Sequence, residues 1–295
     1  VYAVIRSPLV SGNNGQLTAF DMPAILKQAE EERTIKVTDY PPESHGFILE
    51  LMRAFQLCYA SDEGQDRPVQ YLVPELLPEF EPEMGMQWNK SPLRMRYRYD
   101  ILPPGLLPRF IVRTHLLSEG ATHWRHGVVL VHAEASALIR AEVDHNEIQI
   151  FVMGGNADIR RVLITMIRSE LSSLHFEMKV QPTEELEISG EQEQWISVKA
   201  LREIEKAETP FQILPIQPDG IANVNVPLEL DKIVPRNARA IDRDSALAPL
   251  PVRLFVSYAH DDERQLKRLD AILDVLEQQH GLASWSDRRL IAGDE

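Results

Sequence analysis

A strictly alternating stretch in the first half of the chain limits the fold more than any other feature. Residues 93–99 read LRMRYRY, so that apolar side chains alternate with arginines. This period of two predicts a strand with one buried side and one solvent-facing side. The Pro-Pro-Gly at residues 103–105 must end the strand, because proline cannot donate to a β-ladder and glycine permits a turn. From residue 105 to 117 apolar residues recur every three to four positions, which predicts a helix.

The residues after this helix predict an antiparallel sheet. Further strands are expected near residues 124–132, 135–143 and 147–153, and a helix capped by Asp158 is expected to reach His175. The simplest arrangement is four to five antiparallel strands with two helices on one face. This part of the chain is therefore predicted to have an α+β fold.

The first 85 residues predict two helices and a short strand. Asp21 can cap a helix that reaches Glu32. A second helix is expected from about Glu43 to Ala60, and residues 71–74 would form a short edge strand. Five apolar residues of the second helix recur at helical spacing and are expected in the core: Phe47, Ile48, Leu51, Met52 and Phe55.

The amino-acid composition changes twice along the last third of the chain. Residues 181–208 are rich in glutamate and are expected to be mainly a solvated loop, with a short helix capped by Ser197. Residues 235–251 combine prolines with mixed charges, as an interdomain linker does. A strand from residue 252, a helix and a second strand around residues 283–285 would then begin a βαβ unit.

Charge and composition exclude several classes of protein. The net charge of −14 makes the chain a poor non-specific binder of nucleic acid, because it has few cations with which to neutralise phosphates. Arg94, Arg96 and Arg98 are better explained as the solvated side of their strand than as a phosphate site. No apolar run approaches the roughly 20 residues that span a bilayer, so no membrane contact is expected. Cys58, the single cysteine, is expected to be a packed thiol; it excludes an intrachain disulfide and fits a reducing, cytoplasmic location.

The segments YDILPPGLLPRFIVRTH and WRHGVVL, at residues 99–115 and 124–130, resemble the COR domain of Roco proteins, which follows a Ras-like GTPase domain in that family. The resemblance implies two lobes. A helical, winged-helix-like lobe would occupy residues 1–85, without its opening residues, and an antiparallel sheet with helices would occupy residues 86–234. The residues that carry the resemblance are structural rather than catalytic: Leu102, Pro103, Pro104, Gly105, Leu106, Leu107, Pro108, Arg109, Phe110, Trp124, Arg125 and Gly127.

The segments LFVSYAHDDE and WSDRRLIAGDE resemble the opening of a TIR domain, which has a flavodoxin-like α/β fold. This incomplete domain would occupy residues 252–295, after a linker at residues 235–251. Some TIR domains cleave NAD with a glutamate on a later helix; Glu295 matches an acidic position of the BB loop instead, so the catalytic part would lie outside this chain. The residues matched to the BB loop, which serves TIR–TIR contacts, are Trp285, Asp287, Arg288, Gly293 and Asp294.

Three apparent chemical sites have simpler explanations. Ser257, His260 and Asp261 suggest a hydrolytic triad, but they share one turn, whereas triad members usually converge from distant segments. The glycine pair at residues 154–155 could hold a phosphate before a helix, but no GxxxxGK[ST] or GxGxxG pattern exists, so a structural turn is expected. Four residues suggest a zinc site but have no readable second shell, so exposed or core-edge histidines are expected instead: His123, His126, His132 and Glu134.

Together the resemblances imply a non-catalytic module that forms a homodimer and links the GTPase domain of the same chain to a TIR effector. No cofactor is expected in these 295 residues, although the complete protein would use GTP and, if the TIR domain is an enzyme, NAD. The amphipathic face around residues 106–117 and the apolar second lobe are the candidate dimer contacts. The rival hypotheses are a COR-regulated TIR NAD-glycohydrolase and a monomeric interaction domain.

Overall fold

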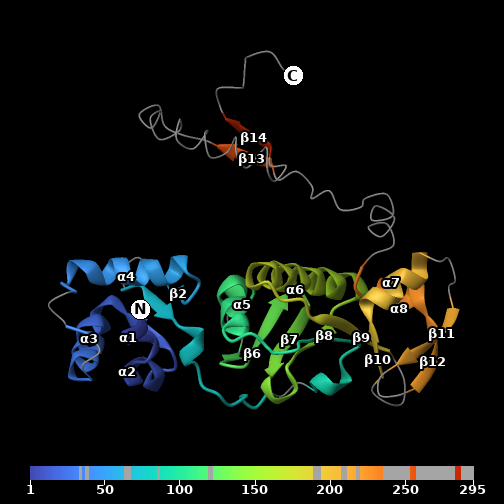
Figure 1. Cartoon of the computed structure of the whole chain (residues 1–295), viewed down its shortest axis with the longest axis horizontal. Coiled ribbons are helices and arrows are strands. Elements are labelled where there is room, and N and C mark those ends of the chain that lie inside the picture. The colour runs from blue at the N-terminus through green and yellow to red at the C-terminus, as the bar shows by residue number, and fades with distance from the viewer. Residues whose placement is uncertain are drawn as a thin grey trace. The chain divides into compact units, whose positions relative to one another are not determined.

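Two compact units make up the computed structural model, Val1–Pro235 and Arg236–Glu295. Within the first unit, we call residues 1–84 the N-terminal subdomain and residues 87–234 the sheet subdomain (Figure 1). The structure describes residues 1–32, 35–36, 40–62, 68–84, 87–118, 122–188, 194–206, 211–216, 220–234, 253–256 and 283–286.

The N-terminal subdomain packs four helices around a small antiparallel sheet of order β1-β3-β2. Its core contains Leu17, Met22, Ile25, Leu49 and Met52, which come from one strand and two helices and are almost fully buried. The elements are α1 (Tyr2–Ile5), α2 (Pro8–Gly12), β1 (Gln16–Thr18), η1 (Ala19–Asp21), α3 (Met22–Glu31), α4 (Glu43–Ala54), β2 (Tyr59–Asp62), β3 (Gln70–Leu72) and η3 (Pro74–Leu76).

The second predicted helix is shorter than expected and turns a different face inward. It ends at Ala54, and residues 59–62 form β2 instead. Phe47 and Phe55 are 67% and 60% exposed, so their assignment to the core was wrong. The buried face contains His45, Ile48, Leu49 and Met52. Both faces carry apolar residues at helical spacing, so the period alone could not choose between them.

Two other local predictions in this subdomain need correction. Asp21 makes no side-chain cap of α3; its carboxylate accepts bonds from the backbone N–H and hydroxyl of Thr18, at 2.7 and 2.9 Å, and so closes η1. Cys58 lies after the end of α4 rather than within a helix. It is buried as expected, and burial raises the pKa of its thiol to about 12, which makes it a weak nucleophile at neutral pH.

The sheet subdomain contains seven antiparallel strands in the order β10-β9-β4-β8-β7-β6-β5, with α5 and α6 on one face (Figure 1). Its strands are β4 (Leu93–Arg98), β5 (His123–Trp124), β6 (Gly127–His132), β7 (Ala135–Glu142), β8 (Glu147–Gly154), β9 (Thr183–Ile188) and β10 (Gln194–Ser197), with the separate hairpin β11 (Phe211–Ile216) and β12 (Gly220–Asn225). Its helices are η4 (Trp88–Lys90), α5 (Leu106–Thr114), η5 (His115–Leu117), η6 (Val143–His145), α6 (Ala157–Met178), α7 (Val198–Lys206) and α8 (Val226–Asp231).

The antiparallel sheet with two helices on one face was predicted correctly, but not its size or its last strands. The glutamate-rich segment 181–208 contains the predicted short helix as α7, but residues 183–188 and 194–197 form β9 and β10 rather than the solvated loop that was expected. β9 pairs with β4, so the sheet continues beyond the four to five strands expected. The helix cap was also misplaced, because Asn156 accepts the N–H of Ile159 at 2.9 Å, whereas Asp158 pairs with Arg161.

Hydrophobic clusters cover both faces of this sheet. The larger one joins the inward side chains of the central strands to α5 and α6, where Phe110, Ile111 and Leu171 are fully buried. Burying each such side chain contributes about 1.5–3 kcal/mol. A smaller cluster lies on the opposite face and consists of Trp88, Trp124, Val129, Leu138 and Phe151. The two clusters fix the sheet between the helices and the segment that leads into η4.

In the second unit the described residues are two short strands. β13 (Arg253–Val256) and β14 (Ala283–Ser286) pair in parallel, with Phe255 opposite Trp285. Both strands lie within or next to the ranges predicted for them. The intervening helix and the linker at 235–251 lie outside the described residues, and the TIR assignment stays a prediction. Among the described residues, no helix has the length and apolar character needed to cross a bilayer.

Candidate functional site

The N-terminal subdomain contributes side chains to the core of the sheet subdomain. Tyr59, Leu72 and Leu77 are buried in the same cluster as the apolar residues of β4 and α5. The rings of Tyr59 and His115 stack with their centroids 4.7 Å apart and an angle of 26° between their planes. Because moving the subdomains apart would expose this shared apolar surface to water, their contact is favourable at about 25 cal/mol for each Å² buried.

Arg113 of α5 forms a polar contact across the same junction. Its Nε donates to Oε1 of Gln56 at 2.9 Å, Nη1 donates to Oγ of Ser173 at 3.0 Å, and Nη2 donates to Oε1 of Glu177 at 2.5 Å. The hydrogen bond from Arg113 is the main cause of the lowered pKa of Glu177. One guanidinium therefore joins the end of α4 to α5 and α6.

The segment between the subdomains is held against the sheet by arginines. The backbone N–H of Arg125 donates to the carbonyl of Pro78 at 2.8 Å, and its side chain pairs with Glu79. Arg140 lies 3.5 Å from Glu81. These contacts, together with the shared core and Arg113, define the subdomain junction, the first part of the candidate site.

The Pro-Pro-Gly motif starts α5 as the sequence predicts. Gly105 has φ +78° and occupies the N-cap position, a left-handed conformation that residues with a Cβ rarely adopt. The N–H of Leu102 donates to Oδ1 of Asn146 at 3.0 Å. Leu106 and Phe110 are fully buried in the core of their own subdomain. The inner face of α5 is thus covered within the chain, whereas Leu116 of the following η5 is 79% exposed and available for other contacts.

The second motif is explained by close packing. A Cβ on Gly127 would lie only 2.1 Å from the ring of Trp124, so this position requires glycine. Trp124 is itself buried in the smaller cluster, across the sheet from the helices. Trp124, Arg125 and Gly127 therefore serve to hold the connecting segment and the sheet together, and Trp124 packs in a different cluster from the α5 residues that follow the Pro-Pro-Gly motif.

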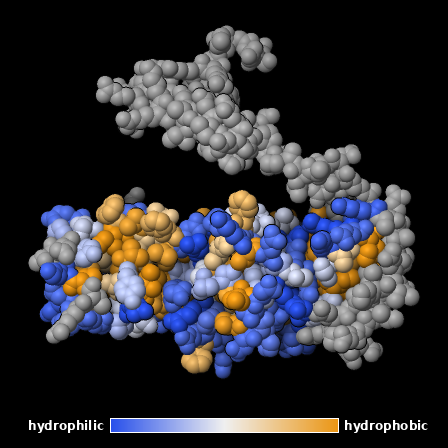
Figure 2. Space-filling model, viewed as in Figure 1, coloured by the Kyte–Doolittle hydropathy of each residue, from blue (hydrophilic) through white to orange (hydrophobic). Residues whose placement is uncertain are grey.

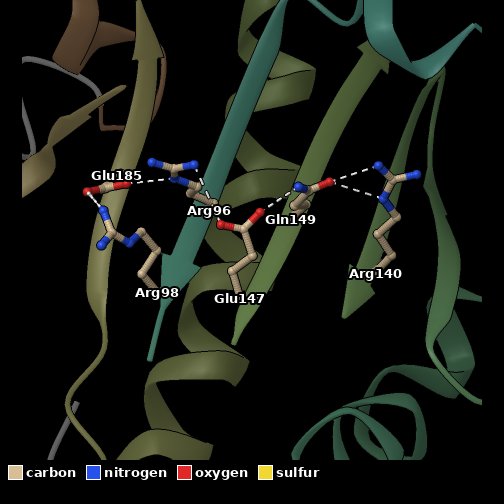
Figure 3. A network of polar contacts seen from close by, with 6 residues as sticks. All are labelled: Arg96, Arg98, Arg140, Glu147, Gln149 and Glu185. Atoms are coloured by element: carbon tan, nitrogen blue, oxygen red, sulfur yellow. Dashed lines mark hydrogen bonds and ion pairs between the residues drawn. The ribbon is translucent and has the colours of Figure 1, made fainter. Parts of the chain in front are cut away.

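Opposite the helices, charged side chains cross four neighbouring strands (Figure 3). We call this set the charged face; it consists of Arg94, Arg96, Arg98, Arg140, Glu147, Gln149, Glu185 and Glu187. Arg96 of β4 is at its centre, 2.6 Å from Glu185 of β9 and 3.5 Å from Glu147 of β8. The side chains of these two glutamates are only 5% and 9% exposed. Buried carboxylates are stable only when paired, so Arg96 is essential to this part of the sheet.

The other arginines of the charged face also have partners. Arg94 lies 2.9 Å from Glu187, and Arg96 lies over the ring of Trp195 at 4.4 Å from its centroid. Arg140 donates to Gln149 at 2.9 and 3.1 Å. The arginines of β4 are therefore paired rather than simply solvated, and their charges are directed to glutamates instead of to a phosphate. This arrangement stabilises the pairing of β9 with β4.

On the helix side of β9, Glu184 accepts two bonds from Arg168 of α6, at 2.6 and 3.1 Å, and one from Tyr97 at 2.8 Å. Burial by itself would raise the pKa of Glu184, but the hydrogen bonds and charge of Arg168 outweigh burial and lower it. Burial raises the pKa of Tyr97 well above its ordinary value. The group is therefore a charged pair with a neutral phenol, and it fixes β9 to α6.

A buried histidine completes this side of the sheet. Nε2 of His175 lies 2.7 Å from the hydroxyl of Tyr99, and the ring meets those of Tyr97 and Tyr99 edge-on. Burial lowers the pKa of His175 from 6.5 to about 4, so the imidazole is neutral at physiological pH. Burial likewise raises the pKa of Tyr99, which keeps its hydroxyl available as a donor.

Four further sites were considered from the sequence: a zinc site, a glycine turn, a hydrolytic triad and the BB loop. Among the described residues no three His, Cys, Asp or Glu side chains are grouped so as to hold a metal, and this includes the four residues considered for zinc. A Cβ on Gly154 would lie 2.4 Å from the carbonyl oxygen of Glu134, so this glycine is needed for a tight turn. The triad residues 257, 260 and 261 and the BB-loop residues 287, 288, 293 and 294 lie outside the described residues, whereas Trp285 lies on β14.

Comparison with known proteins supports a COR assignment for the sheet subdomain. Residues 90–234 match the family model described as the C-terminal of Roc, COR-B domain. Two curated relatives, both named Roc-COR-CHAT protease, are each 22% identical to the chain. The one from Runella zeae aligns over 142 residues, 48% of this chain and 15% of the relative; the other, from an unknown prokaryotic organism, aligns over 169 residues, 55% and 16%.

The antiparallel sheet with its two covering helices therefore lies in the part of the chain that is similar to the COR-B domain, and the match supports a Roco-type COR module at residues 90–234. The match supports the COR resemblance for residues 90–234, while the lobe boundaries and the TIR resemblance stay predictions. The chain spans less than a fifth of the length of the curated relatives that it matches.

Proposed function

We propose that this chain is the coupling and dimerisation module of a Roco-type signalling protein. In this role it links a GTPase domain of the same protein to a C-terminal effector, and it performs no chemistry itself. The observation that carries the proposal is the match of residues 90–234 to the COR-B family, together with a subdomain junction built from a shared core.

The physical basis of such coupling is differential contact. A domain that binds one arrangement of the two subdomains better than another shifts their equilibrium by the difference in its affinities. The junction supports this role because it combines buried apolar contacts with the three bonds of Arg113. Contacts of this kind have discrete alternatives rather than a continuous range of positions.

The N-terminal subdomain offers a surface for the GTPase domain. Phe20, Phe47 and Phe55 are 78%, 67% and 60% exposed, and Figure 2 shows apolar side chains gathered on the face of this subdomain that is in view. Exposed aromatic residues are typical of protein contacts. We propose that this surface receives the GTPase domain of the same chain, whereas dimerisation uses the outer surface of the sheet subdomain.

The identity of the effector separates this proposal from its rival. The sequence segments that resemble a TIR domain favour a TIR effector, which would be either an assembly domain or an NAD-glycohydrolase regulated by COR. The relatives are named for a CHAT protease instead. Different effectors after a similar COR segment support a general coupling role for that segment.

The test uses the complete protein with its upstream and downstream residues. Light scattering with GDP and with a non-hydrolysed GTP analogue should give a dimer whose stability depends on the nucleotide, and Phe47→Ser with Phe55→Ser should remove this dependence. A monomer under all conditions would refute the proposal. NAD consumption by the same sample would establish the enzymatic rival, and its absence from a folded complete protein would leave assembly.

A further inference from the structure

The two ends of α6 contact two different parts of the chain. Near its C-terminal end, Ser173 and Glu177 accept bonds from Arg113 at the subdomain junction, at 3.0 and 2.5 Å. Near its N-terminal end, Nε of Arg161 donates to the backbone carbonyl of Asp231 at 2.7 Å. Asp231 is the last residue of α8, the last helix described before residue 235. One helix thus touches both the junction and the end of the sheet subdomain.

The helix between these contacts is long and continuous. Its 22 residues correspond to a length of about 33 Å. It contains neither proline nor glycine, the usual causes of a kink, between its cap at Asn156 and the left-handed residue Lys179. Its inward face is buried between residues 163 and 175, through Leu163, Ile164, Ile167, Leu171, Leu174 and His175, and Ile159 and Met178 near its two ends are partly buried against the large core cluster. A helix packed in this way shifts as one body rather than bending.

At the junction, α6 is sensitive to the position of the N-terminal subdomain. Gln56, which follows α4 with φ +57°, accepts the third bond of Arg113. The guanidinium is planar and its donors have fixed directions, so it keeps all its partners only in one arrangement. The Arg113 side chain is 15% exposed, which leaves little water to replace a lost partner. A displacement of Gln56 therefore changes the hydrogen bonds that Arg113 makes with α6.

At the other end, α8 depends on Arg161. The last carbonyls of a helix have no partner within the helix, and a charged donor satisfies one of them here. Leu230 and Ile233 next to it are fully buried in the large core cluster. The bond from Arg161 thus holds the end of α8 in register with α6, immediately before the residues that lead to the C-terminal unit.

We infer that α6 transmits a displacement at the subdomain junction to the C-terminal end of α8. The inference rests on the proposed coupling function and specifies its route, from Gln56 through Arg113 and α6 to Arg161 and Asp231. The feature that distinguishes this route from general packing is its polar contact at each end of a single rigid helix.

Hydrogen exchange on the full chain, followed by mass spectrometry, tests the inference. Gln56→Ala and Arg113→Met should each speed exchange of the backbone amides of residues 230–234 by about threefold or more. By reciprocity, Arg161→Met should speed exchange at residues 56–59. The matched control is Arg160→Met. Arg160 belongs to the same end of α6, but its guanidinium donates to the carbonyls of Gly154 and Gly155, so residues 56–59 should keep their rates.

Two outcomes would overturn the inference. One is faster exchange at the junction in Gln56→Ala and Arg113→Met while residues 230–234 keep the wild-type rate. The other is an equal effect of Arg160→Met and Arg161→Met at residues 56–59. Unchanged exchange in β7 and β8 identifies variants that are folded, and Gln56→Ala provides the milder change if Arg113→Met fails this criterion. Neither outcome bears on nucleotide-dependent dimerisation, so failure of this route would leave the proposed function intact.

Discussion

Replacing Arg96 should destabilise the sheet far more than replacing its neighbour Arg98. In Arg96→Met, the 9% exposed Glu147 loses the cation paired with it, and the 5% exposed Glu185 keeps the more distant Arg98. Removing one partner of a buried ion pair costs about 3–5 kcal/mol, because the remaining charge is uncompensated. Arg98 is 44% exposed and 3.4 Å from Glu185, and an exposed pair contributes only about 0–1 kcal/mol.

Urea unfolding of the full chain, followed by tryptophan fluorescence, measures this difference, since the ring of Trp195 lies 4.4 Å from the Arg96 guanidinium. With a slope of about 2 kcal/mol per molar urea, Arg96→Met should lower the midpoint by about 1.5–2.5 M, and Arg98→Met by less than about 0.5 M. Adding Glu147→Gln and Glu185→Gln to Arg96→Met should restore much of the loss. Equal midpoints for the two single variants, or a triple variant weaker than Arg96→Met, would refute the reasoning.

Three further predictions concern single positions. Gly127→Ala should cost about 2 kcal/mol or more, since its Cβ would overlap the Trp124 ring, and thermal unfolding should show the loss; an unchanged melting temperature would contradict the packing argument. Because the pKa of His175 is about 4 when folded and 6.5 when unfolded, the unfolded chain binds an extra proton between these values. Stability should therefore be full above pH 6.5 and fall by about 3 kcal/mol towards pH 4; His175→Gln should flatten this part of the pH profile, and an unaltered profile would count against it. Gly154→Ala, at φ +75° and against a backbone oxygen, should cost more than 1 kcal/mol in urea unfolding, whereas a neutral effect would mean that the turn relaxes.

The sequence predicted the elements in which one local signal dominates. The alternation at residues 93–99, the Pro-Pro-Gly stop and the strands up to residue 153 agree with β4, α5 and β6 to β8. These elements depend on period and turn chemistry, both of which are local.

The elements that the sequence did not predict correctly depend on partners far away in the chain. Residues 183–188 read TEELEI, in which Leu186 and Ile188 alternate with glutamates, a period-two signal that the acidic composition obscured. The carboxylates are buried only because the arginines of β4 lie opposite them, about 90 positions earlier. The matching alternation of arginines and glutamates was the available signal, but one strand does not reveal which other strand it pairs with.

The candidate site was predictable only in part for the same reason. The Trp-Arg-His-Gly motif was recognisable, but its role depends on the contact of Arg125 with Pro78 and Glu79. Neither the junction formed by Gln56 and Arg113 nor the link from Arg161 to Asp231 has a sequence pattern. Such contacts depend on how complete elements pack, and residue types alone do not specify them.

The position of β4 has a consequence for folding during synthesis on the ribosome. Both neighbours of this strand come much later in the chain, β8 at residues 147–154 and β9 at residues 183–188. Once β4 has been synthesised, about 50 further residues must therefore be added before β8 can pair with it, and about 90 before β9 can. Non-local pairing of this kind is slow, and strand edges that stay unpaired in the meantime promote aggregation. Its three closely spaced arginines would repel one another and other nascent copies during that interval, so the same charges that later complete the sheet would first act as protection against premature association.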